Sequence, residues 1–459
     1  MAREEGYRLV HLDLKGAPPK LSYLQQIFPL LKKWNANGLL IEYEDMFPYE
    51  GNLKPLASPS AYSKDDVRAI GEMAKDNDLL VIPLVQTFGH LEFVLKHPEF
   101  FILREDPGHT RSLCPSKPDS LRLVVEMIDQ VMSLHPHLRW FHIGADEVYH
   151  LGECDLCKAR MLDEGLTKEM LFLSHVRSVA HQVMTKFPTT QLIMWDDMFR
   201  LSDAQVIKES GIGSLVEPMV WYYQPCDIPV IDIWKKYSQV FSNIWLGSAF
   251  KGATGIQQYA TDITYHLGNH VMWLTVMMKE AGKFDHIRGI ALTGWQRYDH
   301  FTVLCELLPA AIPSLGLCLQ TIHTGSFTSK VHETVSQDLQ CTGLLPLNPF
   351  QLPAAPECSF PGCDIYILGI QLVHLDAQFE WKILSHFRSE QGDLCKMNLP
   401  PESEKMSAVL SECERLLSAY EEIRQKFVKS LADVFFPHTV EEWINVHVIV
   451  KILKLKDFL

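Results

Sequence analysis

Residues 139–147 read Arg-Trp-Phe-His-Ile-Gly-Ala-Asp-Glu, an apolar run that ends in two adjacent carboxylates. Successive side chains of a strand point to opposite faces, so His142, Gly144 and Asp146 are expected to share the inner face. Asp146 is then the last inward residue, and Glu147 opens a loop in which its direction is free. Both carboxylates can converge on one ligand because the strand ends there. The alternative is that the pair is a solvated cap on the following helix.

This run is one of eight strand-like segments that alternate with segments of helical periodicity. The strands are expected at residues 7–15, 38–45, 79–86, 140–146, 191–197, 215–221, 240–248 and 287–295. Strand–helix alternation predicts parallel strands joined by right-handed crossovers. Eight such units predict an α/β fold, a (β/α)8 TIM barrel. The first strand is not followed by Gly-x-Gly-x-x-Gly, which disfavours a nucleotide-binding sheet.

Three regions are expected along the 459 residues. Residues 1–314 would form the catalytic barrel. Residues 315–363 would be a connecting segment with a Pro-rich linker, because five prolines stand between positions 345 and 362. Residues 364–459 would form a C-terminal helical region packed on the barrel or on another subunit, and the second arrangement would make a homodimer.

Composition narrows the classes of function and partner. Asp and Glu outnumber Lys and Arg by 56 to 42, a net charge of −14, which disfavours a nucleic-acid partner. We expect no membrane insertion, because no apolar stretch is long enough. The chain has no apolar signal core and no Asn-x-Ser/Thr sequon, and its 11 cysteines are an odd number that predicts free thiols. These features predict a cytoplasmic protein, also compatible with the nucleus, rather than a secreted one.

Polar and aromatic residues collect at the C-terminal ends of the expected strands, and in a TIM barrel the active site lies at that face. They are Asp13, Lys15, Glu42, Glu44, Gln86, His90, Asp146, Glu147, Trp195, Asp197, Trp221, Tyr223, Ser248, Trp295 and Arg297. A set drawn from all eight strands predicts one functional site there.

Residues 142–147 resemble the His-x-Gly-Gly-Asp-Glu motif of glycoside hydrolase family 20, with Ala145 in place of the second glycine. The resemblance covers most of residues 7–300. Residues 83–90, Pro-Leu-Val-Gln-Thr-Phe-Gly-His, are similar to the family's Pro-Glu-x-Asp-x-Pro-Gly-His segment. Met194-Trp195-Asp196-Asp197, the pair Arg8 and Asp13, and Trp295 match its fifth, first and last strands. The chain looks closest to the intracellular branch of the family.

The resemblance implies a retaining exo-N-acetyl-β-hexosaminidase, which acts on glycans with terminal β-linked N-acetylgalactosamine or N-acetylglucosamine. The substrate's acetamido oxygen would attack C1 and give an oxazolinium ion. Asp146 would hold the amide N–H and stabilise the cation. Glu147 would be the acid and then the base, with its pKa raised by burial and by the charge of Asp146. The resemblance also implies substrate-binding residues, namely Arg8, His90, Trp195, Asp197, Trp221, Tyr223, Trp295 and Arg297. This route requires no metal and no cofactor.

Three positions depart from the family pattern. Gln86 stands where the family has Asp, and Arg297 stands where the family has a carboxylate that grips sugar hydroxyls. The Tyr that binds the acetamido group falls near Phe250 or Lys251, so Tyr223 is expected to supply that hydroxyl. These changes affect hydroxyl recognition and leave the two acids intact.

Other interpretations stay open. Cys154 and Cys157 form a Cys-x-x-Cys pair that Cys114 or His150 could complete as a zinc site, although free thiols are favoured. One rival function is a metal-dependent barrel hydrolase with His90 and His142 among its ligands. The chain's only His-x-His pair, however, precedes the fourth strand and so lies at the wrong end of the barrel. A second rival is a non-catalytic sugar-binding protein, which would have no use for a protonated glutamate.

Overall fold

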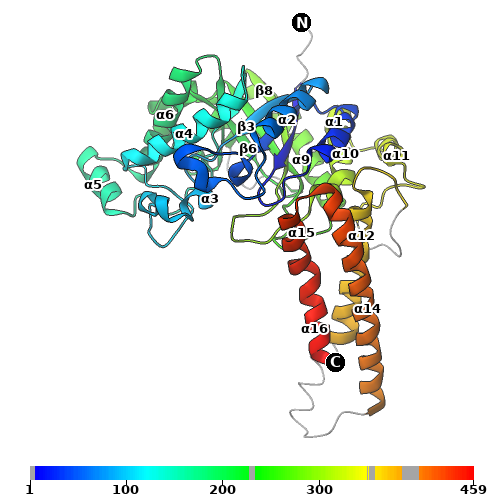
Figure 1. Cartoon of the computed structure of the whole chain (residues 1–459). Coiled ribbons are helices and arrows are strands. Elements are labelled where there is room, and N and C mark those ends of the chain that lie inside the picture. The colour runs from blue at the N-terminus through cyan, green and yellow to red at the C-terminus, as the bar shows by residue number, and fades with distance from the viewer. Residues whose placement is uncertain (1–5, 227–232, 349, 351–356, 385–402) are drawn as a thin grey trace.

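The computed structural model describes residues 6–226, 233–348, 350, 357–384 and 403–459. Eight parallel strands pair in chain order, and β1 pairs with β8 to close the barrel (Figure 1). The strands are β1 (Tyr7–Asp13), β2 (Gly38–Glu42), β3 (Leu80–Leu84), β4 (Trp140–His142), β5 (Gln191–Trp195), β6 (Val216–Trp221), β7 (Asn243–Lys251) and β8 (His286–Gly294). Each overlaps an expected segment, so the predicted TIM barrel is confirmed.

The barrel interior is filled by side chains and is not a channel. Every strand contributes to one buried cluster: Leu9, Leu40, Ile82, Leu84, Trp140, Ile193, Trp195, Met219, Trp245 and Ala291. Phe141, Ile143 and Ala145 belong instead to the larger cluster between the strands and the surrounding helices. The expected alternation of residues 140–145 is therefore confirmed.

Helices cover the outside of the barrel. They are α1 (Leu21–Lys33), α2 (Lys64–Asp76), α3 (Glu92–Leu95), α4 (Pro118–Leu134), α5 (Asp155–Glu164), α6 (Lys168–Lys186), α7 (Ala204–Glu209), α8 (Ile233–Ser238), α9 (Ile263–Glu280) and α10 (Leu308–Thr324). Short 3₁₀ segments such as Glu44–Met46 and Asp197–Phe199 follow the strands. The predicted end of the barrel at residue 314 falls inside α10, whose Ser314 hydroxyl donates to the carbonyl of Phe250 on β7 (2.8 Å).

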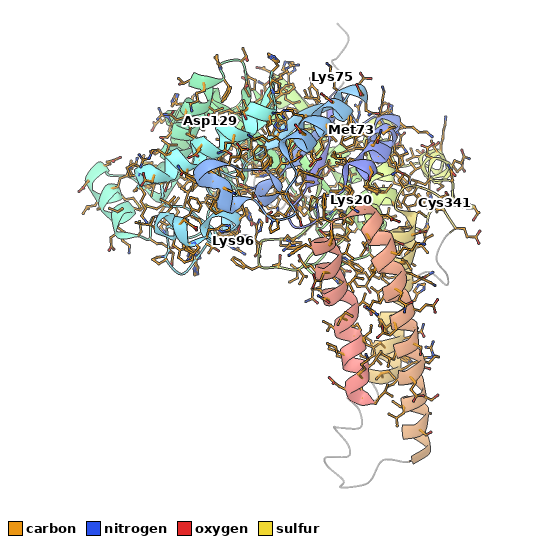
Figure 2. All side chains as sticks on the ribbon, viewed as in Figure 1. Lys20, Met73, Lys75, Lys96, Asp129 and Cys341 are labelled. Atoms are coloured by element: carbon orange, nitrogen blue, oxygen red, sulfur yellow. A yellow bond between two sulfur atoms is a disulfide. The ribbon has the colours of Figure 1, made fainter. Side chains whose placement is uncertain are left out.

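The C-terminal region is helical, as predicted, and extends away from the barrel (Figure 1). It contains α12 (Cys363–Phe379), α14 (Ser403–Val434), α15 (Pro437–Ile444) and α16 (Val450–Phe458), with π-helical turns at Glu380–Leu384 and Asn445–Ile449. α14 packs along α12 and α16. It meets the barrel at Lys20 (Figure 2), whose backbone N–H donates to the carbonyl of Val434 (2.7 Å). Among the described helices, none is both long and apolar enough to span a membrane.

The connecting segment contains α11 (Ser329–Asp338), and much of the expected Pro-rich linker (349 and 351–356) lies outside the described residues. The expectation of free thiols is wrong for two cysteines, because Cys341 and Cys358 form a disulfide beside α11 (Figure 2). Backbone hydrogen bonds from Thr342 to Glu357 (2.9 Å) and from Ser359 to Leu339 (3.0 Å) bring the two segments together. Sequence spacing gave no sign of this pairing.

Candidate active site

The Asp-Glu pair is presented by a turn and not by the end of a strand. β4 ends at His142, four residues earlier than expected, and the backbone then enters the left-handed region at Gly144 (φ 61°), Ala145 (φ 67°) and Glu147 (φ 46°). A Cβ at Gly144 would lie 2.0 Å from Oε1 of Gln86, so only glycine fits. Non-glycine residues in this region store strain of about 1–3 kcal/mol each, which surrounding contacts must offset.

Side chains of the neighbouring segments help to hold the turn by hydrogen bonds. The Thr87 hydroxyl donates to the carbonyl of Ile143 (2.7 Å), and the backbone N–H of Ala145 donates to Oε1 of Gln86 (3.3 Å). The N–H of Glu147 donates to Oδ2 of Asp197 (2.9 Å). Gln86, which departs from the Asp of the family pattern, thus supports the turn that carries Asp146 and Glu147.

The turn opens into a cavity of about 530 Å³ at the C-terminal ends of the strands. Eight of the predicted site residues line it, namely His90, Asp146, Glu147, Trp195, Trp221, Tyr223, Trp295 and Arg297. Asp197 lies directly behind Glu147 and does not line the cavity. The barrel fold therefore brings together residues that are spread over more than 200 positions of the sequence.

Arg8 is the exception and must be removed from the expected site. It lies five residues before Asp13 on β1, and at about 3.3 Å per residue this places it about 16 Å from the strand end. Its guanidinium donates to the backbone carbonyls of Asn35 (2.6 Å) and Gly6 (3.1 Å) at the opposite end of the barrel. The spacing to Asp13 matched the family pattern without bringing the side chain to the pocket.

His90 lies between the two catalytic candidates. Its Nε2 is 3.4 Å from Oδ2 of Asp146 and 3.2 Å from Oε2 of Glu147. Burial alone would lower the pKa of His90, but the charge of Asp146 and hydrogen bonds to both carboxylates outweigh burial and raise it well above its usual value. The two carboxylates therefore favour the protonated form of the imidazole that lies between them.

This histidine reverses one expectation about Glu147. We expected burial and the Asp146 charge to raise the pKa of Glu147, but its hydrogen bond to His90 dominates and lowers it. Burial acts in the opposite direction and is the weaker effect, since the side chain retains 32% of its exposure. In this state of the protein the hydrogen bond to His90 favours the carboxylate form of Glu147.

Asp197 and Asp146 occupy different environments. Burial first, and the charge of Asp146 second, raise the pKa of Asp197 to about 7. Its Oδ1 accepts the indole N–H of Trp221 (3.2 Å). Oδ1 of Asp146 is buried and receives no hydrogen bond within the described part of the chain. A buried acceptor at the cavity wall is suited to an N–H donor on a ligand.

The floor of the cavity carries a buried ion network. Lys15 Nζ lies 3.2 Å from Asp13, 3.7 Å from Glu42 and 3.6 Å from Glu44. Burial would lower the pKa of Lys15, but these carboxylates outweigh it and raise the pKa well above its usual value. Glu42 also accepts from His11 (3.1 Å). One lysine is therefore shared by three buried carboxylates, and Lys15 and Glu42 of this network line the cavity.

Aromatic rings form one wall. The rings of Trp221 and Tyr223 stack with centroids 5.1 Å apart, and those of Trp195 and Trp295 are 6.1 Å apart. Such rings offer apolar faces to the C–H groups of a sugar and polar edges to its hydroxyls.

Arg297 connects the cavity to the C-terminal region. Its guanidinium donates to both carboxylate oxygens of Glu442 on α15, each at 2.8 Å. On the neighbouring strand, Phe250 is buried, and Lys251 donates to Gln296 (2.6 Å) instead of facing the cavity. Of Phe250, Lys251 and Tyr223, it is Tyr223 that carries a hydroxyl and lines the cavity, so the expected source of an acetamido-binding hydroxyl stays Tyr223.

Strand-end reasoning missed several cavity residues that stand on loops or, in the case of Tyr265, on α9. They are Arg111, Tyr149, Tyr222, Gln224, Tyr265, Tyr298 and Asp299. Arg111 follows β3 by 27 positions and donates to Asp299 (2.8 Å). Several of the others, such as Tyr149, Tyr222 and Tyr298, stand within two residues of a predicted site residue, a signal that could have identified them.

Comparison with known proteins agrees with this geometry. Residues 41–239 match glycosyl hydrolase family 20, catalytic domain. The match, together with a relative 44% identical over 96% of the chain, shows that the chain belongs to this family and is a glycoside hydrolase. That relative is Hexosaminidase D from Homo sapiens, of which the chain covers 91%; Hexosaminidase D from Bos taurus is 50% identical over 73% of this chain and 98% of the relative.

Solved structures support the fold independently. A crystal structure of a beta-N-acetylhexosaminidase superposes with a TM-score of 0.54 at 16% identity, covering 74% of this chain and 76% of the other. Flavobacterium johnsoniae chitobiase gives 0.51 at 13% identity, covering 98% and 72%. At such identities the likeness concerns the barrel fold alone.

Proposed function

We propose that this glycoside hydrolase is a retaining exo-N-acetyl-β-hexosaminidase that uses its substrate's acetamido group as the nucleophile. The substrates would be glycans with terminal β-linked N-acetylgalactosamine or N-acetylglucosamine, which agrees with the names of the two Hexosaminidase D relatives. The observation that carries the proposal is the pairing of Asp146, with its buried unpartnered Oδ1, and the more exposed Glu147 on one cavity wall.

The hydrogen bonds and ion pairs of the other carboxylates near the cavity favour the substrate's acetamido group as the nucleophile. A retaining glycosidase that uses a protein nucleophile needs a second free carboxylate across the sugar from the acid. Glu42 is paired with Lys15 and His11, and Asp299 with Arg111. Asp197 accepts two hydrogen bonds behind Glu147. Both oxygens of each of these three groups already accept a hydrogen bond from the protein, unlike Oδ1 of Asp146.

Asp146 and Glu147 would have different roles in the reaction. Oδ1 of Asp146 would accept the acetamido N–H, turn the carbonyl oxygen toward C1 and stabilise the positive charge of the oxazolinium ion. Glu147 would give a proton to the departing oxygen and later take one from water. His90, 3.2 Å from Glu147, is placed to hold the Glu147 carboxyl in position and to set its protonation.

A thiazoline that mimics the oxazolinium ion tests this scheme. It should inhibit competitively and bind about 10²-fold or more tightly than the product. The reason is that a mimic of the intermediate makes the contacts that the enzyme forms with the intermediate and not with the ground state. Asp146→Asn should weaken inhibition and turnover together, since a neutral amide cannot stabilise the cation. Asp299→Asn removes the same charge from another cavity aspartate and should preserve thiazoline affinity far better.

Substrate analogues give the second arm of the test. A trifluoroacetyl group makes the amide oxygen a poorer nucleophile, so it should slow the native enzyme. Equal rates on glucosides without an acetamido group, or indifference to the thiazoline, would overturn the proposal and point to a protein nucleophile.

A further inference from the structure

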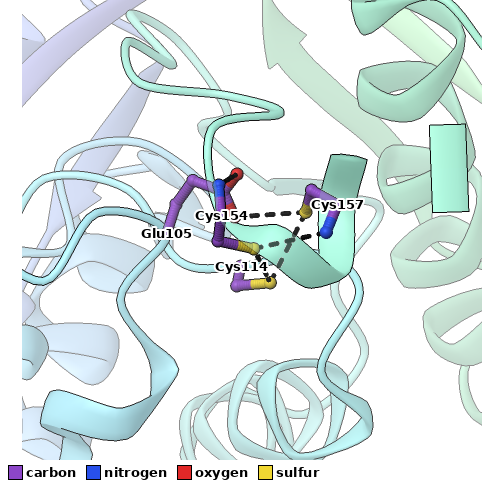
Figure 3. Close-up of side chains that lie close together, drawn as sticks. All are labelled: Glu105, Cys114, Cys154 and Cys157. Carbon is purple, nitrogen blue, oxygen red and sulfur yellow. Dashed lines mark hydrogen bonds between the residues drawn. The ribbon is translucent and has the colours of Figure 1, made fainter. Parts of the chain in front are cut away.

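A cluster of four potential metal ligands lies outside the catalytic cavity. Sγ of Cys114 is 3.4 Å from Sγ of Cys154 and 3.5 Å from Sγ of Cys157, and Sγ of Cys157 is 3.2 Å from Oε2 of Glu105 (Figure 3). The four ligand atoms all lie within 4.8 Å of one another. Glu105, Cys114 and Cys157 are buried, and Cys154 is half-buried.

We propose that Glu105, Cys114, Cys154 and Cys157 bind a structural Zn²⁺ ion. In a tetrahedral site with Zn–S bonds of about 2.3 Å and a Zn–O bond of about 2.0 Å, the sulfurs are about 3.8 Å apart and each lies about 3.5 Å from the oxygen. The three separations given above are a few tenths of an ångström shorter, and the other pairs lie within 4.8 Å, so a small shift admits the ion. They are far above the length of about 2.05 Å of a disulfide.

The surroundings suit a negatively charged ligand set. Cys154 is the N-cap of α5, and its sulfur accepts the backbone N–H of Cys157 (3.3 Å). The Ser116 hydroxyl lies 3.1 Å from Sγ of Cys157. These donors and the positive end of the helix dipole favour thiolates. As each Zn–S bond forms, the thiol releases its proton to solvent.

Glu105 gives an independent reason for a cation. Its Oε1 accepts the backbone N–H groups of Glu153 (2.7 Å) and Cys154 (3.1 Å), which leaves Oε2 directed at the sulfurs. Within the described residues this buried carboxylate forms no ion pair with a Lys, Arg or His side chain. A buried carboxylate without a cation is costly, and a bound zinc ion would remove that cost.

The ion would clamp the two loops that shape the catalytic cavity. Glu105 and Cys114 stand on the loop after β3 that carries Arg111, while Cys154 and Cys157 follow the loop that carries Glu147. None of the four ligands lines the cavity, so the ion would position residues and touch no reacting atom. The site is independent of the proposed hydrolytic mechanism.

Metal content of the full chain tests the proposal. Protein purified with zinc and dialysed against metal-free buffer should retain one zinc ion per chain by mass spectrometry. Cys154→Ser combined with Cys157→Ser should lose it. A second candidate group, Asp106, His109 and His150, is more exposed, so His109→Ala combined with His150→Ala is the matched control and should retain the ion.

Two further measurements keep the test decisive if the cysteine variant does not fold. Glu105→Gln keeps all three thiols and should weaken zinc affinity by about 10-fold or more, because it replaces a charged ligand. Cobalt in place of zinc should give the near-ultraviolet band of thiolate-to-cobalt charge transfer in the native chain. The proposal would be overturned by any of three results: zinc-free protein with three freely titrating thiols, a disulfide between two of these cysteines, or loss of zinc in the histidine variant alone.

Discussion

Replacing His90 by Gln should move the high-pH limb of kcat/KM to higher pH. The protonated ring, 3.2 Å from Glu147, is the main reason that the pKa of Glu147 is lowered. Removing a group that stabilises the carboxylate raises the pKa of that carboxyl. The protonated form of Glu147 that kcat/KM requires then persists to higher pH.

The size of the shift follows from the contact that is lost. A hydrogen bond to a charged group contributes about 1.5–3 kcal/mol and a neutral one about 0.5–1.5 kcal/mol. The difference of roughly 1–1.5 kcal/mol corresponds to about one pKa unit at 1.36 kcal/mol per unit. Because Glu147 is 32% exposed, solvent screening favours the lower end of that range.

The measurement is steady-state hydrolysis of an aryl β-N-acetylglucosaminide across the acidic and neutral range, with melting temperatures to check folding. His109→Gln makes the same exchange at an exposed histidine that does not line the cavity and should leave the profile unchanged. An unmoved limb in His90→Gln, or a limb moved to lower pH, would show that His90 does not set the protonation of Glu147.

Three other changes probe the acid, the turn and the C-terminal contact. Glu147→Gln should cut turnover about 10²–10⁴-fold on poor leaving groups and much less on activated aryl glycosides; an equal slight loss on both substrates would exclude it as the acid. Ala145→Gly should leave stability within about 1 kcal/mol in calorimetry, because relief of a left-handed alanine offsets glycine's entropy. Ala180→Gly in α6, equally buried, should cost more. Glu442→Gln should lower the free energy of unfolding by about 1–3 kcal/mol. It should also raise KM more than it lowers kcat, because Arg297 loses the carboxylate that holds it. An unchanged KM would show that the contact with α15 does not position Arg297 in the cavity.

The barrel and most of the cavity were accessible from sequence for a physical reason. Parallel strands of one barrel end at the same face, so polar residues that follow short apolar runs must meet there. Trp195, Trp221 and Trp295 were found in this way, and the structure places all three at the cavity. Arg8 shows the limit of motif matching, because spacing along a strand does not state which end of the barrel a side chain reaches.

The pattern of strands in the sequence could not predict the contacts that residues on different loops make with one another. Arg111 and Glu105 stand on the segment after β3, and nothing in their local sequence marks a partner. Glu105 meets Cys157 across 52 positions, a closure that depends on how two loops pack. The charge of Glu147 was misjudged for the same reason: His90 (φ 51°) sits in a left-handed turn, and no periodicity predicts that its ring reaches between the acids.

The turn after β4 shows why the directions of the two acids could be inferred although the backbone was not. The apolar alternation through Ala145 favours a strand, yet pairing stops at His142 and the chain turns through Gly144 and Ala145. Hydrogen bonds with Gln86, Thr87 and Asp197 hold this turn, together with the bond from the Trp195 N–H to the carbonyl of Gly144 (3.1 Å). These partners lie on β5 or just after β3 and β5, the two strands beside β4. The strained presentation of Asp146 and Glu147 is therefore a property of the closed barrel, and weakening either neighbour should displace the acids before it unfolds the chain.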